Sequence, residues 1–293
     1  MDHKSFIAAL PAADKAALTG TSDAAGLRHL AAHMGLIFLV GGLIAARVPF
    51  WPVLLPIQGL LVIFLFTLEH ECTHKTPVRS PALNDWVGRV CGFLILLPFE
   101  WFRYFHLAHH RFTNIPGRDP ELAVEKPATR RQWVVYVSGL PAWWGNLRLL
   151  FRLVAARERA EYLPQGALPR MQREARVMVG LYALVGLVLC WSPLLFWVWI
   201  FPVLIGQPFL RLYLLAEHGD CPPVASMFEN TRTTFTNRAV RFLAWNMPYH
   251  VEHHVFPAVP FHRLADLHVL MRQHLKITAD GYAAFTRDYL ARR

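Results

Sequence analysis

The stretch VPFWPVLLPIQGLLVIFLFTL, residues 48–68, contains no charged side chain and is followed directly by Glu69 and His70. A helix that crosses a bilayer needs about 20 predominantly apolar residues, and this stretch is long enough. Two further charge-free runs occur in the chain, residues 34–46, which extend back through Leu30, and residues 177–210. The sequence therefore predicts an integral membrane protein built from helices.

The composition supports this interpretation and excludes other classes of protein. The chain has 293 residues and a net charge of +10, yet only 17% of its residues are charged and 54% are hydrophobic. A basic soluble protein would carry about 25% charged residues. A nucleic-acid-binding protein would place its positive charge on a polar surface, whereas this chain has long stretches without charge. Only four Cys are present, too few for a disulfide scaffold. We therefore expect no nucleic-acid partner.

The longest charge-free run, residues 177–210, exceeds one membrane helix and carries Trp191-Ser192-Pro193 near its middle. Because Ser-Pro favours a turn, this run is expected to form two helices, the second reaching Leu215. The predicted fold is all-α, with four transmembrane helices in two hairpins. Their expected bounds are about 30–47, 51–69, 177–192 and 194–215.

The distribution of basic residues predicts the orientation in the membrane. Among the Lys and Arg residues, only Arg47 falls in a short turn between two predicted spans. Since basic residues accumulate on the cytoplasmic side, both termini and the regions 70–176 and 216–293 are expected there as a cap. Residues 1–28 would form a cytosolic segment ahead of a single domain, residues 29–293. The apolar segments 87–102 and 133–151 are expected to lie flat in the membrane interface.

Nine of the 15 histidines are grouped on the predicted cytoplasmic side. Residues three or four apart on a helix share a face, so each group is expected to aim at one point. A single group has an ordinary structural explanation, and so does the isolated His218, but two HxxHH groups together with HxxxH are not expected by chance. The nine are His70 and His74; His106, His109 and His110; His218; and His250, His253 and His254.

Nine imidazoles exceed what one octahedral ion accepts, so two metal ions are the simplest interpretation. Neutral imidazole suits zinc, copper, iron and nickel, while magnesium and calcium prefer oxygen ligands. A structural zinc site usually includes thiolates, and only Cys72 lies within a histidine group. Two metals on imidazole ligands fit iron used for oxygen activation. Zinc remains open, because spacing does not identify the ion.

The three groups resemble the histidine boxes of the membrane fatty acid desaturase superfamily, HxxxH, HxxHH and HxxHH. The surroundings are similar too, with HHRFTN followed by DPE at residues 109–121, and NMPY before the third box with FP after it. The resemblance runs from about His70 to His268 and favours the bacterial type, in the cytoplasmic membrane. No His-Pro-Gly-Gly motif of a fused cytochrome b5-like domain is present.

This resemblance implies four membrane helices under a cytosolic cap that holds two iron ions, with O2 as co-substrate. It implies that an external donor, such as a ferredoxin-like protein, supplies electrons. The expected reaction places a double bond in the acyl chain of a lipid or acyl thioester. The implied ligands are the box histidines His70, His74, His109, His110, His250, His253 and His254, with His106 by pattern and His218 by its position. No side chain beyond the metal centre is expected to be catalytic.

Four carboxylates are candidates to accept the second N–H of ligand imidazoles and fix their tautomers, namely Asp119, Glu121, Glu217 and Glu252. The alternative for each is an ordinary solvated side chain. Arg232, Arg238 and Arg241 precede the third box and are candidates to receive an acidic donor or a head group. Their alternative is general positive charge of the cytoplasmic side.

Two rival functions stay open at this stage. The same boxes are found in hydroxylases and ketolases, which act on carotenoids, sphingolipids or alkanes and retain oxygen in the product. A metal transporter or storage protein would need polar ligands within its spans, and the boxes instead lie at helix ends and in the cap.

Overall fold

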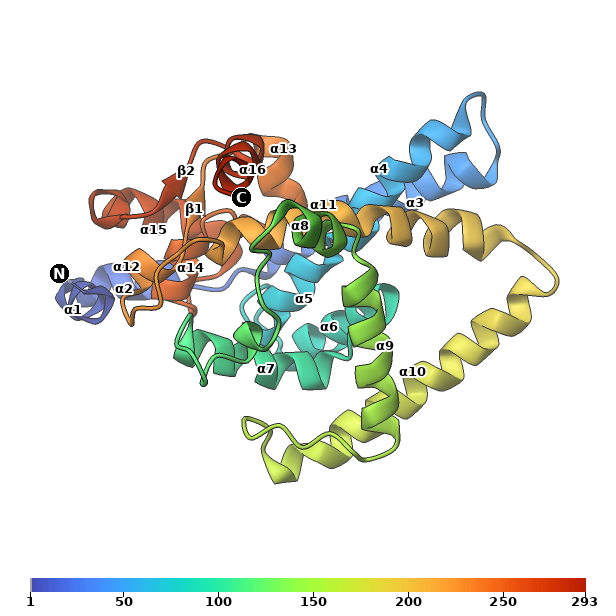
Figure 1. Ribbon diagram of the computed structural model, residues 1–293, viewed down its shortest axis with the longest axis horizontal. Helices are drawn as coiled ribbons and strands as arrows, with labels where there is room; N and C mark the ends of the chain where they lie inside the picture. The colour runs from blue at the N-terminus through green and yellow to red at the C-terminus, as the bar shows by residue number, and fades with distance from the viewer. Residues whose placement is uncertain (1) are drawn as a thin grey trace.

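The structure is a computed structural model that describes residues 2–293, and it is mostly helical (Figure 1). The first half of the chain forms α1 (His3–Ala9), α2 (Ala12–Thr19), α3 (Asp23–Ala45), α4 (Leu54–Ile63), α5 (Leu65–His74), α6 (Pro81–Ile95), α7 (Phe99–Phe112), α8 (Arg130–Val137) and α9 (Leu140–Val154). The second half forms α10 (Leu168–Leu189), α11 (Phe201–His218), α12 (Met227–Asn230), α13 (Arg238–Leu243), α14 (His250–Val255), α15 (Leu264–Met271) and α16 (Tyr282–Ala291).

Short elements connect these helices. The single-turn elements are η1 (Trp51–Val53), η2 (Pro120–Ala123), η3 (Gln165–Ala167), η5 (Phe261–Arg263), η6 (Arg272–His274) and the π-helical turn η4 (Phe196–Ile200). Strands β1 (Thr233–Thr234) and β2 (Thr278–Ala279) pair in parallel and tie the segment before the third histidine box to the one before α16.

Three helical segments are long and apolar enough to cross a membrane within the described part of the chain. They are Ala12–Ala45, Trp51–His74 and Phe196–His218. The pair α6 and α7 would make a fourth if it counted as one span, although it is bent by 101°. The three segments cover nearly all of the predicted first, second and fourth spans, so the prediction of apolar membrane helices is confirmed for them.

Residues 177–189 of the predicted third span, 177–192, lie in α10, which is not among the three candidate segments. The helix ends at Leu189, close to the turn that Trp191-Ser192-Pro193 predicted. The first turns of α10 carry four charged residues, Arg170, Arg173, Glu174 and Arg176. Only residues 177–189 of the helix are therefore free of charge. In Figure 1, α10 diverges from α11 beyond the turn and lies beside α9.

The two segments expected in the interface are helical but bent. Residues 87–102 cover the end of α6, a sharp break and the start of α7. Residues 133–151 cover most of α8 and α9, which meet at Gly139 with a φ of +74°. A Cβ at Gly139 would lie 2.3 Å from Cγ of Gln207, so this corner sits directly against α11.

Helices α4 and α11 pack backbone to backbone at a pair of glycines. A Cβ on Gly59 would lie 2.3 Å from the carbonyl oxygen of Pro202, and a Cβ on Gly206 would lie 2.4 Å from that of Gly59. Small residues allow this close approach between membrane helices, where lipid provides no hydrophobic drive for association. The contact sets the relative position of two helices that lead to His70 and His218.

Replacing Gly59 by Val is expected to separate α4 from α11. Overpacking a close contact costs about 1–3 kcal/mol, so the detergent-purified variant should unfold at a lower temperature than the parent. Gly35 provides the control, because a Cβ there meets nothing within 4 Å. Thermal unfolding of Gly59→Val and Gly35→Val measures the difference, and equal midpoints would contradict this packing role.

Candidate metal centre

Four helices deliver the nine grouped histidines to one region of the molecule. His70 and His74 come from α5, three come from α7, His218 is the last residue of α11, and three come from α14. Seven of the nine side chains are buried, and His74 and His110 are half-buried. The structure divides them into two neighbouring clusters.

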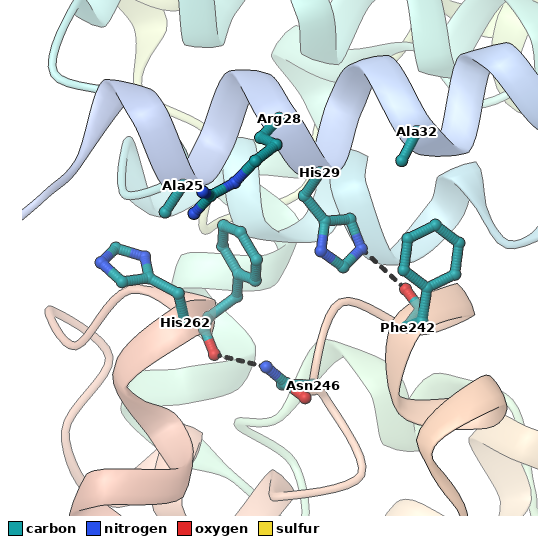
Figure 2. Close-up of a pocket in the computed structure, with 8 residues that line it drawn as sticks. Ala25, Arg28, His29, Ala32, Phe242, Asn246 and His262 are labelled. Atoms are coloured by element: carbon teal, nitrogen blue, oxygen red, sulfur yellow. Dashed lines mark hydrogen bonds between the residues drawn. The ribbon is translucent and has the colours of Figure 1, made fainter.

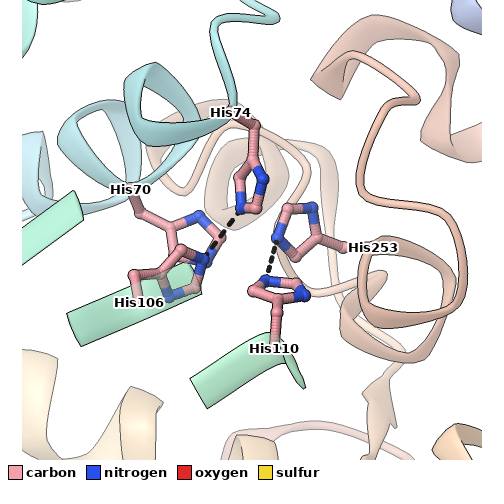
Figure 3. A group of neighbouring side chains, drawn as sticks. All are labelled: His70, His74, His106, His110 and His253. Atoms are coloured by element: carbon pink, nitrogen blue, oxygen red, sulfur yellow. Dashed lines mark hydrogen bonds between the residues drawn. The ribbon is translucent and has the colours of Figure 1, made fainter. Parts of the chain in front are cut away.

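The first cluster contains five imidazoles, which face one another in Figure 3. One ring nitrogen from each lies within 4.8 Å of those of the others. Nε2 of His74 is 2.9 Å from Nε2 of His106, and Nε2 of His110 is 3.1 Å from Nε2 of His253. The members are His70, His74, His106, His110 and His253.

The second cluster is formed around His218. Ring nitrogens of His109, His218 and His254 lie within 4.8 Å of one another. His250 joins them, because its Nε2 is 3.1 Å from Nε2 of His218 and 3.1 Å from Nε2 of His254. Nε2 of His109 is 3.2 Å from Nε2 of His218. Four imidazoles therefore converge at a second position.

This arrangement corrects the expectation that each HxxHH box aims at one point. In the second box, His106 and His110 belong to the first cluster and His109 to the second. The reason is that residues four apart on a helix differ by about 40° in direction, whereas neighbours differ by about 100°. The third box divides in the same way, with His253 in the first cluster. The second and third boxes thus contribute to both clusters and link them, whereas His70 and His74 of the first box both belong to the first cluster.

Hydrogen bonds at the opposite ring nitrogen define the tautomers in the second cluster. Nδ1 of His109 donates to the carboxylate of Asp119 at 2.9 Å, and Nδ1 of His218 donates to the backbone oxygen of Asn230 at 3.1 Å. Thr113 donates its hydroxyl proton to the backbone oxygen of His109, so its Oγ1 accepts from Nδ1 of His254 at 3.1 Å. In neutral form, all three rings then carry the proton on Nδ1.

The Nε2 atoms of these three rings consequently present lone pairs to one another. Lone pairs at 3.2 Å repel unless a cation lies between them, so His109, His218 and His254 fit a metal ion. The first cluster shows the same need, because both ring nitrogens of His70 are buried without a hydrogen-bond partner among the described residues. The residues present therefore suit two metal ions bound by imidazole.

Burial keeps several of the rings neutral, as metal ligation requires, whereas the pKa of His109 is raised because the charges of Glu121 and Asp119 outweigh its burial. Burial lowers the pKa of His253 well below its usual value, with the charges of His70 and His74 adding to the effect. Burial lowers the pKa of His254 in the same way, with His110 and His250 adding to it. Neutral imidazole is the metal-binding form, so protons compete weakly for these sites.

Asp119 occupies the position that the sequence suggested for it. Its side chain is buried, and its two oxygens lie 2.9 and 3.1 Å from Nδ1 of His109. The same carboxylate accepts from the backbone N–H groups of Asn114 at 2.7 Å and Glu121 at 2.9 Å. It thereby fixes both the ring of His109 and the turn η2.

The other three carboxylates are placed differently from one another. Oε1 of Glu217 is 3.3 Å from Nδ1 of His250. Glu252 contacts no grouped histidine through its carboxylate, which instead bonds His268 and the hydroxyl of Thr233. Oε2 of Glu121 lies 3.4 Å from Nε2 of His109, the nitrogen that faces the cluster. Burial alone would raise the pKa of Glu121, but His109, Lys126 and Arg211 outweigh it and lower that pKa.

Two residues that orient the rings were not singled out from the sequence. Thr113 follows the second box within HHRFTN, so its place beside the box was the available signal. Asn230 lies in FEN with no motif around it, yet it is fully buried. Its amide donates to Thr113 O at 3.0 Å, and its backbone oxygen also accepts from Nδ2 of Asn114 at 2.8 Å. Asn230 therefore connects α11 to the end of α7.

Three of the remaining histidines, His29, His33 and His262, lie outside both clusters and close to α3 or within it. His33 accepts from the indole N–H of Trp245 and donates to the backbone oxygen of Leu61. A cavity of about 360 Å³ beside α3 contains two more, His29 and His262, and none of the nine grouped histidines (Figure 2). His29 donates to the backbone oxygen of Phe242 there. This cavity is separate from the candidate metal centre.

Apolar membrane helices and two buried imidazole clusters together define a membrane oxidoreductase of the histidine-box class. The family model described as fatty acid desaturase matches residues 49–286, and the chain belongs to this family. Residues 49–286 include all nine grouped histidines and both ends of the apolar helices that carry them.

Several characterised desaturases are similar to the chain. An sn-1 acyl-lipid omega-3 desaturase (ferredoxin) of Nostoc sp. is 23% identical over 258 residues, which cover 79% of this chain and 69% of that protein. A protein of the same description from Synechocystis sp. is 28% identical over 167 residues, or 53% of this chain and 46% of that protein. A sphingolipid delta(4)-desaturase DES1-like protein of Oryza sativa is 24% identical over 209 residues, or 68% of this chain and 57% of that protein.

Proposed function

We propose that the protein is an O2-dependent di-iron desaturase that introduces a double bond into the acyl chain of a lipid or acyl thioester. The observation that carries this proposal is the pair of adjoining imidazole clusters, five and four rings, to which two apolar segments contribute His70, His74 and His218 at their ends. The similarity to acyl-lipid desaturases supports the choice of reaction.

The proposed ligands of the first metal are the five rings of the first cluster, and those of the second metal are His109, His218, His250 and His254. Iron bound there would supply the oxidation of an unactivated C–H bond by O2. The protein's own part is to hold the rings correctly turned through Asp119, Thr113 and Asn230, and to exclude water from the buried clusters.

An apolar groove beside α5 supports an acyl chain as the substrate. It measures about 240 Å³ and lies between α3, α5 and α6. Its walls are exclusively apolar side chains, and Leu65 on one wall is little more than one helical turn before His70. A groove of this kind favours a hydrocarbon over any polar substrate. Its lining includes Leu30, Met34, Leu65, Val87, Cys91 and Leu94.

Electrons are proposed to come from a separate ferredoxin-like donor, as the names of the cyanobacterial relatives suggest. Of the three arginines considered for such contacts, Arg232 is buried and donates to the backbone oxygen of Ala216, so it is part of the interior. Arg238 is exposed and Arg241 half-buried ahead of the third box. An acidic donor surface would therefore meet Arg238 first.

We further propose a single membrane domain over residues 29–293, with residues 1–28 ahead of it, although α3 already begins at Asp23. Both termini and the clusters are placed on the cytoplasmic side, because Arg47 is the one basic residue in the outer turns. The third span, proposed for α10, rests on residues 177–189 and on the turn that follows.

Lipid profiling tests the reaction directly. The chain is expressed in a bacterial host that lacks the activity, under ¹⁸O₂, and the acyl chains are analysed by mass spectrometry. A new unsaturated fatty acid without ¹⁸O, absent in His109→Ala, is the expected result. Products that carry hydroxyl or keto oxygen would instead establish the hydroxylase or ketolase alternative. Metal uptake by proteoliposomes without O2 consumption would favour a transporter.

A further inference from the structure

The carboxylate of Glu121 lies beside Nε2 of His109, the ring nitrogen that faces the second cluster. Its neighbour Asp119 instead binds Nδ1, on the opposite side of the same ring. Asp119 holds Nδ1 at 2.9 Å, and Oε2 of Glu121 lies 3.4 Å from Nε2. Nε2 is also the atom that faces His218 at 3.2 Å. A carboxylate that only fixed the tautomer would sit at Nδ1, and that place is already filled by Asp119.

We propose that Glu121 is a carboxylate ligand of the metal held by His109, His218, His250 and His254, an inference that rests on the function proposed above. Two donors that bind one ion at about 2.1 Å lie roughly 3–4 Å apart. The separation of Oε2 from Nε2 of His109 falls within this range, as does that of His218 from the same atom.

The rest of the Glu121 side chain is held in this direction. Its second oxygen, Oε1, is 3.7 Å from Nζ of Lys126, so the ion pair leaves Oε2 free to lie beside Nε2 of His109. Its backbone N–H donates to Asp119 at 2.9 Å, which fixes the start of η2 relative to His109. One residue, Asp119, thus positions both the ring and the backbone from which the carboxylate projects.

The donor counts of the two clusters give an independent reason. The first cluster offers five imidazoles and the second offers four. A carboxylate from Glu121 brings the second position to five donors as well, and leaves one place of an octahedron open at each. The two positions would still differ chemically, because only the second would hold an anionic oxygen ligand, which lowers the reduction potential of a bound iron.

Iron content and Mössbauer spectra of the ⁵⁷Fe-loaded protein test this assignment without relying on activity. Glu121→Gln is expected to alter the signal of one of two iron sites and to lose that iron first when a chelator is added. The affinity for that iron is expected to fall at least about 10-fold, because even residues that only contact a metal ligand contribute about 10–100-fold to metal affinity. Glu125→Gln is the control, because Glu125 is exposed in the same loop.

The outcomes separate this proposal from the one on which it rests. If the parent binds two irons and Glu121→Gln leaves both signals and their chelator resistance unchanged, Glu121 is not a ligand while the proposed function stands. Equal loss of both irons in Glu121→Gln would also overturn the assignment to one position. If the parent binds no iron, both proposals fail together.

Discussion

Replacing His218 by alanine is expected to remove one iron per chain and to lower desaturation by more than about 100-fold. Nε2 of His218 lies 3.2 Å from that of His109 and 3.1 Å from that of His250, so it is the central ring of the second cluster. Without it, three imidazoles remain there, while the five of the first cluster are untouched. Metal analysis and lipid profiling of the same preparation measure both effects.

His262→Ala is the matched control for this experiment. His262 belongs to neither cluster and lines the separate cavity beside α3. It should keep both irons and full activity. Retention of iron and activity by His218→Ala would exclude His218 as a ligand, and loss of iron in His262→Ala would show that histidines outside the clusters take part.

The second large effect is expected for Asp119→Asn. The amide of an asparagine either presents an N–H donor to Nδ1 of His109 or accepts from Nδ1–H without the negative charge of the carboxylate. In both cases the ring can adopt the tautomer whose Nε2 carries the proton. That nitrogen then no longer offers a lone pair to the metal. Iron affinity at the second position should fall about 10–100-fold, as is typical for residues that orient ligands.

Iron titration with a competing chelator measures the affinity change in Asp119→Asn. Asp266→Asn serves as its control, because Asp266 is exposed and pairs with Arg263 away from the clusters. Thermal unfolding of the apo forms separates a metal defect from a folding defect, since Asp119 also caps the turn η2. Unchanged iron affinity and activity in Asp119→Ala would show that Asp119 does not orient His109 for metal binding.

Much of this site follows from the sequence because its spacing is governed by helix geometry. The groups at His70, His106 and His250 lie on α5, α7 and α14, and the structure brings their members together in the two imidazole clusters. His218 had only its position at the end of an apolar run to identify it, and it occupies the centre of the second cluster. The charge-free runs likewise predicted the helices that carry these groups.

The division of the second and third boxes between two clusters could not be obtained from spacing. It depends on the direction from which each helix approaches, and on the sharp bend of 101° between α6 and α7. Asn230 was missed for a similar reason, because it acts through a backbone oxygen that any residue possesses. Glu252 lies between His250 and His253 in sequence, but its carboxylate binds His268 and Thr233, since successive helix positions point in different directions.

The extent of the third predicted span also depended on tertiary structure. Residues 177–210 are uniformly free of charge, so the sequence placed a span on each side of the turn. In the structure the first half of this run shares α10 with four charged residues, and α10 packs beside α9. Hydropathy alone does not show how much of an apolar run is used for a turn.

The metal content of the purified protein tests the central claim most directly. Two clusters of five and four imidazoles predict two iron ions per chain in protein expressed in iron-sufficient medium, with the second lost selectively in His218→Ala. Inductively coupled plasma mass spectrometry on quantified protein gives the number and the element together. One metal per chain, or zinc in place of iron in an enzymatically active preparation, would contradict the account.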